Sequence, residues 1–186
     1  MKRIFDLIFA IFLLFLSIIP MLIIALMLKL TSKGPVFFWS DRVGIDNTIF
    51  KMPKFRTMLL DTPAVATHLL CNADVYLTLI GRFLRKFSLD ELPQLFSIIT
   101  GDMTFVGPRP ALFNQCDLIE SRTKMNVHTL IPGVTGWAQV NGRDNLSIPA
   151  KVEFDEYYLK NRSLFLDSKI LLITVCKVIK KEGISH

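Results

Sequence analysis

The sequence predicts a mainly α-helical protein with a small β-hairpin, an α+β fold in which a membrane helix precedes one compact domain. Three observations support this fold class: an apolar run over residues 7–28, a β-rich segment around a turn after it, and helical spacing in most of the remaining chain. We expect residues 1–33 to form the membrane helix. Residues 34–186 are expected to form one structural unit that ends in an amphipathic helix at the membrane surface.

Composition limits the possible partners. At 186 residues the chain is long enough for one domain with its own core. Its net charge of +6, together with an apolar N-terminus, suits an anionic membrane surface or phosphorylated ligands. We expect no nucleic-acid partner, because the basic-aromatic repeats of nucleic-acid-binding modules do not occur. The three cysteines and three histidines are scattered, which argues against a disulfide framework and against a zinc cluster.

The apolar run is long enough to cross a bilayer, since a helix over residues 7–28 would measure about 33 Å. Basic residues flank the run on both sides, namely Lys2, Arg3, Lys29, Lys33 and Arg42. The positive-inside tendency therefore draws both ends to the cytoplasmic face. Pro20 interrupts the hydrogen-bond ladder and permits a sharp bend. We expect a re-entrant helix broken at Pro20, with a single kinked transmembrane helix as the alternative.

The next segment predicts a β-hairpin. Residues 36–39 and 48–51 flank a turn region around Gly44, and Pro53 is expected to end the second strand. Lys54 and Arg56 then alternate with an apolar residue, so the two cations either line a site or belong to a solvated basic loop.

A loop is expected over residues 61–74, followed by a helix over residues 75–87. The spacing of this helix would gather three cations near its end, namely Arg82, Arg85 and Lys86.

Asp90 and Glu91 stand side by side at a predicted helix start. With Ser88 as N-cap in a capping box, Pro93 would clash with the preceding turn. With Asp90 as the cap, Pro93 falls in the first turn, and the helix runs from about residue 91 to a stop at Gly101. Acidic residues are common in a first helical turn because the macrodipole favours them. The surrounding cations favour a second interpretation, a site for a phosphate ester and a metal ion.

Arg109 lies between Pro108 and Pro110, and each proline restricts the residue before it to extended geometry. An arginine held in this way is suited to grip a phosphate, although a simple structural turn is the competing interpretation. Residues 104–106 predict a short extended piece, and residues 111–125 a polar-faced helix.

The C-terminal third begins with a turn-rich segment over residues 132–143, in which a tight turn at residues 141–142 would present Arg143. A short helix around residues 154–158 follows. Asp167 is expected to cap a last helix that runs to about Glu182, with apolar residues opposite several lysines. This pattern is typical of a helix in the headgroup plane, and nearly as typical of a core helix with a solvated basic face.

These segments together resemble the bacterial sugar transferases, the monotopic phosphoglycosyl transferases of glycoconjugate and polysaccharide assembly. The resemblance covers nearly the whole chain and rests on five motifs in the expected order. They are KFRTM over residues 54–58, SLDELPQL over 88–95, GDM over 101–103, FVGPRP over 105–110 and PGVTGWAQVNGR over 132–143. One departure concerns the helix break: the family often has serine directly before the proline, whereas here Ile19 precedes Pro20.

The resemblance implies a function and a location. The family combines a re-entrant membrane helix with a compact catalytic domain, and its reaction moves a phospho-sugar from a UDP-sugar to polyprenyl (undecaprenyl) phosphate with release of UMP. It implies a monotopic protein among membrane lipids, on the cytoplasmic face of the bacterial inner membrane. The sequence assigns neither the sugar nor the oligomeric state, and a homo-oligomer remains possible.

The resemblance also implies roles for individual residues. Asp90 would be the nucleophile that carries the phospho-sugar, and Glu91 its acidic partner as metal ligand or proton acceptor. Both carboxylates are candidate ligands for Mg²⁺. The basic positions that match phosphate-binding positions are Lys54, Arg85, Arg109 and Arg143.

Elementary chemistry agrees with these roles, because an ionised carboxylate can attack phosphorus and split one hard step into two. We expect the nearby arginines to keep Asp90 ionised by lowering its pKa. The main alternative is a non-catalytic membrane adaptor that binds lipid phosphate in a glycan-assembly complex. A two-carboxylate glycosidase fits poorly, because adjacent residues cannot flank a sugar ring at the separation of roughly 5–9 Å which that chemistry uses.

Overall fold

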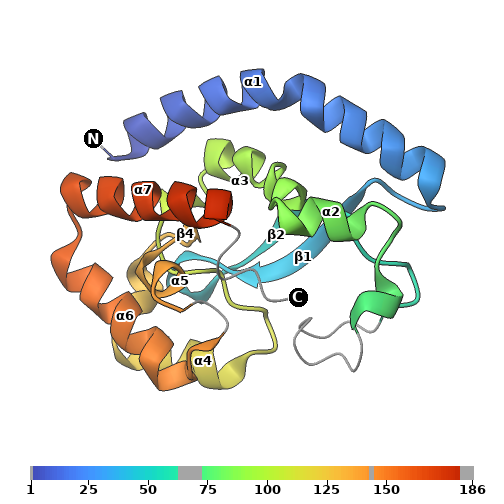
Figure 1. The fold of residues 1–186 in the computed structure, drawn as a ribbon. Coiled ribbons are helices and arrows are strands. Elements are labelled where there is room, and N and C mark those ends of the chain that lie inside the picture. Colours follow the sequence, from blue (N-terminus) through green and yellow to red (C-terminus); the bar gives the residue numbers. More distant parts are fainter. Residues whose placement is uncertain (1, 63–72, 143–144, 181–186) are drawn as a thin grey trace.

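The computed structural model describes residues 2–62, 73–142 and 145–180, and it has the predicted mainly α-helical architecture with small β-sheets (Figure 1). The α-helices are α1 (Lys2–Thr31), α2 (Gly81–Lys86), α3 (Gln94–Thr100), α4 (Cys116–Lys124), α5 (Trp137–Val140), α6 (Ile148–Asn161) and α7 (Leu164–Lys180). The strands are β1 (Phe37–Val43), β2 (Ile49–Phe55), β3 (Thr104–Val106) and β4 (Gly133–Thr135). Short 3₁₀-helices are η1 (Ile45–Asn47), η3 (Ala73–Tyr76), η4 (Leu89–Glu91) and η5 (Val127–Thr129).

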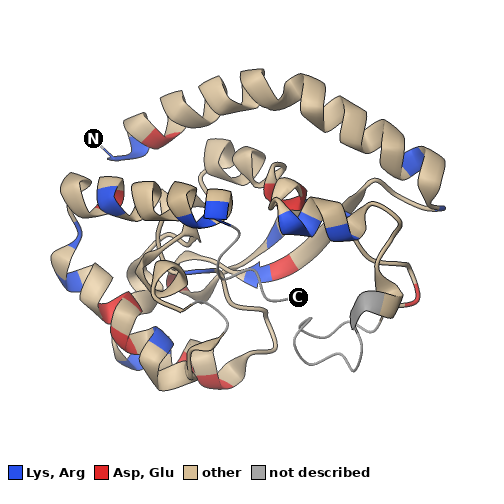
Figure 2. Cartoon of the chain, in the orientation of Figure 1, with Lys and Arg blue, Asp and Glu red and all other residues tan. Residues whose placement is uncertain are grey.

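α1 is one continuous helix that arches across one side of the molecule and runs through Pro20 without an interruption at the expected break (Figure 1). Within the described ranges it is the one helix long and apolar enough to cross a membrane. Figure 2 shows charged residues only near its two ends. The return of this helix to the same membrane face, and the division into residues 1–33 and 34–186, stay predictions.

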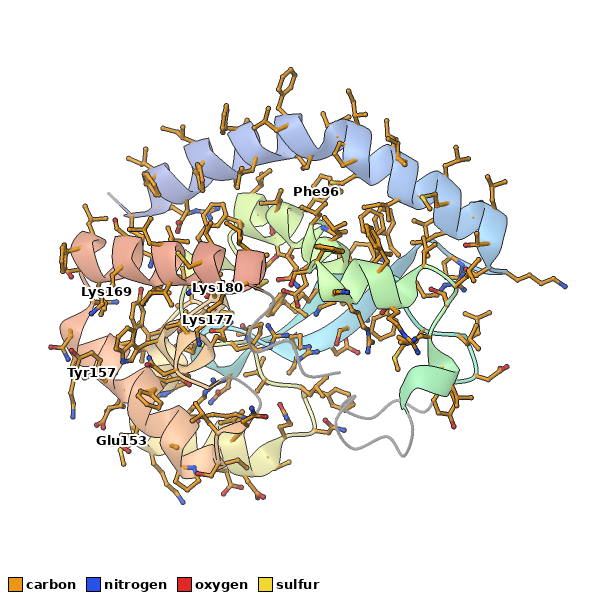
Figure 3. All side chains as sticks on the ribbon, in the orientation of Figure 1. Phe96, Glu153, Tyr157, Lys169, Lys177 and Lys180 are labelled. Carbon is orange, nitrogen blue, oxygen red and sulfur yellow. The ribbon has the colours of Figure 1, made fainter. Side chains whose placement is uncertain are left out.

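The two sides of α1 differ in exposure. Ser17, Met21, Ile24 and Leu28 recur every three or four residues and are buried against the domain. The opposite side carries large apolar residues that point away from the body, and Phe15, for example, is 75% exposed. Figure 3 shows this row of outward side chains. An exposed apolar surface of this length suits contact with lipid rather than water.

Polar contacts tie both ends of α1 to the same body. At the start, the Lys2 ammonium donates hydrogen bonds to Asp167 (2.7 Å) and to the Tyr158 hydroxyl (2.8 Å). At the other end, the buried Arg56 guanidinium donates to the Lys33 carbonyl (2.6 Å) and to the Ser32 hydroxyl (2.7 Å). Arg56 therefore holds the chain just after the C-terminal end of α1. Lys54 is the other cation of the motif at residues 54–58, and it is available to a site.

The predicted hairpin is formed by β1 and β2, which pair antiparallel. The expectation that Pro53 ends the second strand was wrong, because β2 continues through Pro53 to Phe55. A two-stranded sheet has two outer edges, so a proline without an N–H can lie inside a strand at little cost. The extra residues place Lys54 on the strand, opposite Phe38.

The segment after the hairpin is less helical than predicted. Residues 63–72 of the expected loop lie outside the described residues. Residues 73–76 form η3, and α2 begins only at Gly81. A side chain at Gly81 would collide with the Thr57 carbonyl oxygen, because a Cβ on that glycine would lie only 2.2 Å from this oxygen. This close packing brings the end of α2, with Arg85, next to the residues that follow β2.

The predicted extended piece at residues 104–106 is β3, and it pairs in parallel with β4, a strand that the sequence pattern did not reveal. Gly107 and Gly133 make this pairing possible, because a Cβ on Gly133 would lie 2.1 Å from the Gly107 nitrogen. The helix after it, α4, is shorter than the predicted range of 111–125.

The C-terminal helices agree with the predictions except at their ends. α6 covers the expected short helix and extends it in both directions. α7 begins three residues before Asp167, and the Ser163 hydroxyl accepts the hydrogen bond from the Leu166 N–H (3.2 Å) instead. Asp167 therefore lies in the first turn and is free to bind Lys2. The expected end at Glu182 lies outside the described residues.

Candidate active site

Asp90 and Glu91 lie in the 3₁₀ turn η4, directly before α3. Pro93 occupies the N-cap position of α3 with helical backbone angles, so neither Ser88 nor Asp90 caps this helix and both capping predictions were wrong. Ser88 instead adopts a left-handed conformation (φ 54°), which turns the chain between α2 and η4. The predicted stop of α3 at Gly101 is confirmed, with φ 105° at that glycine. The short turn presents both carboxylates at one end of α3.

Glu91 is held by two cations from distant parts of the chain. The Lys54 ammonium lies 2.7 Å from Glu91 Oε1, and the Arg109 guanidinium lies 3.3 Å from the same oxygen. The side chains of Lys54 and Glu91 are only 15% and 14% exposed. β2, η4 and the loop after β3 therefore meet at this carboxylate, and two of the residues predicted to bind phosphate lie next to it.

Asp90 is buried, with 8% of its surface exposed. Burial raises the pKa of its carboxyl above the ordinary value, while the positive charges of Lys54 and Arg85 oppose this rise and the charge of Glu91 adds to it. The expectation that arginines lower the pKa of Asp90 was therefore wrong in net direction, because the loss of hydration outweighs the cations. A poorly hydrated carboxylate next to cations is suited to attack an electrophile once it is ionised.

Arg85 reaches the cluster from the end of α2. Its Nε donates a hydrogen bond to the Thr57 hydroxyl (2.9 Å), which fixes the guanidinium near Asp90. Burial lowers the pKa of Arg85, and the charge of Asp90 partly restores it. For Lys54 as well, burial lowers the pKa and Glu91 raises it. The cluster thus keeps several charges in a partly dehydrated space, where each interacts strongly with an added phosphate.

Hydrogen bonds from two sides hold the backbone of the loop that carries Arg109. The Arg122 guanidinium donates to the Arg109 carbonyl (2.7 Å) and pairs with the buried carboxylate of Asp155 (2.6 Å). On the other side, the Gly133 N–H donates to the Pro108 carbonyl (2.8 Å). Arg109 therefore lies in a backbone fixed by α4, α6 and β4, which supports the interpretation that its side chain is pre-positioned for an anion.

Arg42 belongs to the site but was predicted only as a charge flanking the membrane helix. It lies on β1 two residues from Ser40, on the hairpin face that also carries Lys54, and its guanidinium donates to the Pro110 carbonyl (3.1 Å). Its charge also lowers the pKa of Lys54. The alternation of the two strands would have revealed it once their register was known. Arg143, the remaining predicted phosphate ligand, lies outside the described residues.

Asp90 and Glu91 are the residues of the site that could hold a Mg²⁺ ion. Among the described residues, no group of three or more histidine, cysteine, aspartate or glutamate side chains could hold a metal by itself. Mg²⁺ commonly takes one or two carboxylates and fills its remaining positions with water and phosphate oxygens. Asp90 and Glu91, adjacent and partly dehydrated, match that donor set.

Comparison with known proteins assigns the family. The family model described as "Bacterial sugar transferase" matches residues 1–181. The chain belongs to the bacterial sugar transferase family. The resemblance seen in the five sequence motifs is thereby confirmed.

Individual relatives extend this result. The chain is 43% identical over 186 residues to "Uncharacterized sugar transferase EpsL" of Bacillus subtilis (strain 168), covering 100% of this chain and 91% of that protein. It is 41% identical over 187 residues to "UDP-glucose:undecaprenyl-phosphate glucose-1-phosphate transferase" of Escherichia coli (strain K12), covering 95% of this chain. It is 36% identical over 203 residues to "Undecaprenyl-phosphate galactose phosphotransferase" of Salmonella typhimurium, covering 98% of this chain. This family member spans only 40% and 41% of the lengths of the latter two relatives.

Proposed function

We propose that this family member is a phosphoglycosyl transferase that moves a phospho-sugar from a UDP-sugar to undecaprenyl phosphate and releases UMP. The observation that carries the proposal is the buried Asp90 beside Glu91, with Lys54 and Arg109 at 2.7 and 3.3 Å from the Glu91 carboxylate. The names of the relatives support the donor and acceptor classes. They differ in the sugar (glucose in one, galactose in another), so the proposal leaves the sugar open.

In the first step, a carboxylate oxygen of Asp90 attacks the β-phosphorus of the UDP-sugar. The bond from that phosphorus to the bridging oxygen breaks, and the electron pair leaves with UMP. This gives an acyl-phosphate between Asp90 and the sugar. In the second step, a phosphate oxygen of the lipid acceptor attacks the same phosphorus. The acyl-phosphate bond breaks, Asp90 is released as a carboxylate, and the sugar is left on a lipid diphosphate.

The residues around Asp90 have separate tasks in this scheme. Arg109 and Lys54 bind phosphate oxygens and hold Glu91 in place, and Arg85 offsets the charge of the attacking carboxylate. Asp90 and Glu91 would hold Mg²⁺, which supplies charge neutralisation at the diphosphate when bound. Glu91 acts beside Asp90 either as a metal ligand or as a proton acceptor.

α1 and α7 support a proposal for the location of the protein. We place the protein on the cytoplasmic face of the bacterial inner membrane, with α1 as a monotopic anchor among lipids. α7 exposes apolar residues such as Phe165 (81%) and Leu172 (68%) beside lysines, and Figure 3 shows Lys169 and Lys177 on the side of α7 away from α1. A lipid acceptor would then keep its phosphate at headgroup level near the site.

A panel of UDP-sugars tests the proposal by measuring UMP release with undecaprenyl phosphate, with the Asp90→Asn variant as the inactive form. Asp102→Asn is the matched control. Asp102 is an exposed carboxylate just after α3, and it accepts a hydrogen bond from the Thr100 hydroxyl. We expect UMP from at least one sugar with the wild type and with Asp102→Asn, and none with Asp90→Asn. UMP formation from no sugar together with intact binding of the lipid acceptor would favour the adaptor alternative.

A further inference from the structure

A cavity lies beneath the first turn of α1, away from the Asp90–Glu91 cluster. Its volume is about 450 Å³, which lies in the range of pockets that hold small ligands. Its walls come from the start of α1, from β3, from the segment before β4 and from the junction of α6 and α7. None of the lining residues belongs to the cluster around Glu91. The α1 residues that pack near that cluster begin at Leu14, about 12 Å farther along the helix than Asp6.

The walls of this cavity are mainly apolar. The side chains that provide this surface are Ile45, Met103, Val106, Leu130, Ile131 and Leu164. An apolar cavity of this size is suited to a hydrocarbon chain, because burial of apolar surface is the dominant favourable term in binding such a chain.

Most of the charged groups at the cavity are already satisfied. Asp167 accepts hydrogen bonds from Lys2 (2.7 Å) and from the Tyr158 hydroxyl (2.6 Å), and Asp6 accepts one from the Thr104 hydroxyl. The Arg3 guanidinium donates to two carbonyl oxygens of α3. Arg162, which ends α6, is exposed and makes no hydrogen bond or ion pair with another residue in the described ranges. The cavity thus combines an apolar interior with one uncommitted guanidinium.

The cavity borders the surface that we assign to the membrane. On α1, Ile4 and Phe5 follow the lining residues Lys2 and Arg3 in the chain and are more than half exposed. On α7, Phe165 follows the lining residue Leu164 and is also exposed. A lipid in the adjacent leaflet can therefore reach the cavity with a chain without leaving the membrane surface.

We propose that this cavity binds an anionic membrane phospholipid, with one acyl chain against the apolar walls and the headgroup phosphate on Arg162. The lipid would lie under the N-terminal end of α1 and would be distinct from the acceptor of the transfer reaction. An anion is favoured over a cation because both carboxylates at the cavity already accept hydrogen bonds, whereas the Arg162 guanidinium donates none within the described chain.

The test measures binding to the full chain in detergent by native mass spectrometry and by thermal shift. The probes are dioctanoyl-phosphatidylglycerol, dioctanoyl-phosphatidylcholine and inorganic phosphate. We expect one phosphatidylglycerol to bind per chain, with clearly weaker binding of phosphatidylcholine and no saturable binding of inorganic phosphate. Arg162→Gln should weaken phosphatidylglycerol binding about tenfold, the usual effect of losing one charge-assisted hydrogen bond.

Three variants keep this test specific. Lys180→Gln removes the same charge from the far end of α7 and should leave binding unchanged. Asp90→Asn should also leave it unchanged, so a failure of the proposed transfer reaction would not affect the result. Ile131→Trp, which fills the cavity, should reduce binding of both phospholipids, provided that thermal unfolding shows it to be folded.

Other outcomes would overturn the proposal. Equal losses with Arg162→Gln and Lys180→Gln would mean general electrostatic attraction. Equal binding of the two phospholipids would exclude recognition of an anionic headgroup, and competition by inorganic phosphate would mean a site for free phosphate. Loss of binding in Asp90→Asn would place the lipid at the transfer site.

Discussion

The Lys54→Met variant removes the cation that lies 2.7 Å from Glu91 and retains a side chain of similar length. Truncating one partner of a hydrogen-bonded, mostly buried ion pair costs about 2–5 kcal/mol. Since Arg109 still contacts the same Glu91 oxygen, we expect the lower part of this range, about 2–3 kcal/mol in transition-state binding. This corresponds to a loss of about 30- to 150-fold in kcat/KM.

The same variant should change the pH dependence of activity. Lys54 is the strongest of the charges that lower the pKa of Asp90, so its removal raises that pKa further. Asp90 must be ionised to attack, and the acid limb of the kcat/KM profile should therefore move to higher pH. The measurement is UMP release across a pH series. An acid limb that stays in place or moves to lower pH would refute the assignment of Asp90 as the nucleophile next to Lys54.

Lys51→Met provides the matched control on the same strand. Lys51 also pairs with a carboxylate, Asp41, at 3.0 Å, but these side chains are 69% and 43% exposed. Exposed pairs contribute about 0–1 kcal/mol, so this variant should keep nearly full activity and an unchanged pH profile. A comparable loss in both variants would mean that any lysine on the hairpin has this effect, for example through membrane binding.

Three further predictions concern stability and topology. Burial raises the pKa of Asp90 in the folded protein. The protonated carboxyl therefore contributes to stability below the pKa of the unfolded chain, near 3.8, and this contribution is lost as the pH rises through the pKa of the folded protein. Asp90→Asn should therefore unfold at a higher temperature than the wild type at neutral pH, with a margin that shrinks toward pH 4 in thermal unfolding; a lower melting temperature at neutral pH would contradict this. Arg122→Met leaves the Asp155 carboxylate buried without its partner and should cost about 3–5 kcal/mol in the free energy of unfolding, much less in the Arg122→Met/Asp155→Leu double variant. Cysteines placed before Lys2 and after Lys33 should both react with an impermeant reagent from the cytoplasmic side, and periplasmic labelling of either one would exclude the re-entrant anchor.

Local patterns were sufficient for the elements whose structure depends on neighbouring residues. The apolar run of α1, the hairpin around Gly44 and the stop of α3 at Gly101 were all predicted, because chain length, alternation and a left-handed glycine are local properties. The motif at residues 88–95 drew attention to Asp90 and Glu91, which the structure places beside Lys54, Arg85 and Arg109. The start of α3 was missed, since the sequence pattern did not reveal the left-handed turn at Ser88 or the 3₁₀ turn that follows it.

The features that the sequence did not reveal are those made by contacts between distant segments. The parallel pairing of β3 with β4 joins residues about thirty positions apart, and no local pattern indicates which strands will meet. The hydrogen bond from the Arg122 guanidinium to the Arg109 carbonyl likewise depends on packing between segments. The direction of the pKa shift of Asp90 was mispredicted for a related reason. Charge can be counted in a sequence, but the loss of hydration is visible only once burial is known.

The most direct test of the central claim is the intact mass of the protein after incubation with a reactive UDP-sugar in the absence of lipid acceptor. The proposed chemistry predicts a gain in mass equal to one phospho-sugar, and peptide mapping should place it on Asp90. The added mass should disappear when undecaprenyl phosphate is added, and the Asp90→Asn variant should not acquire it. UMP release with no adduct on the polypeptide, or with the adduct on another residue, would contradict it.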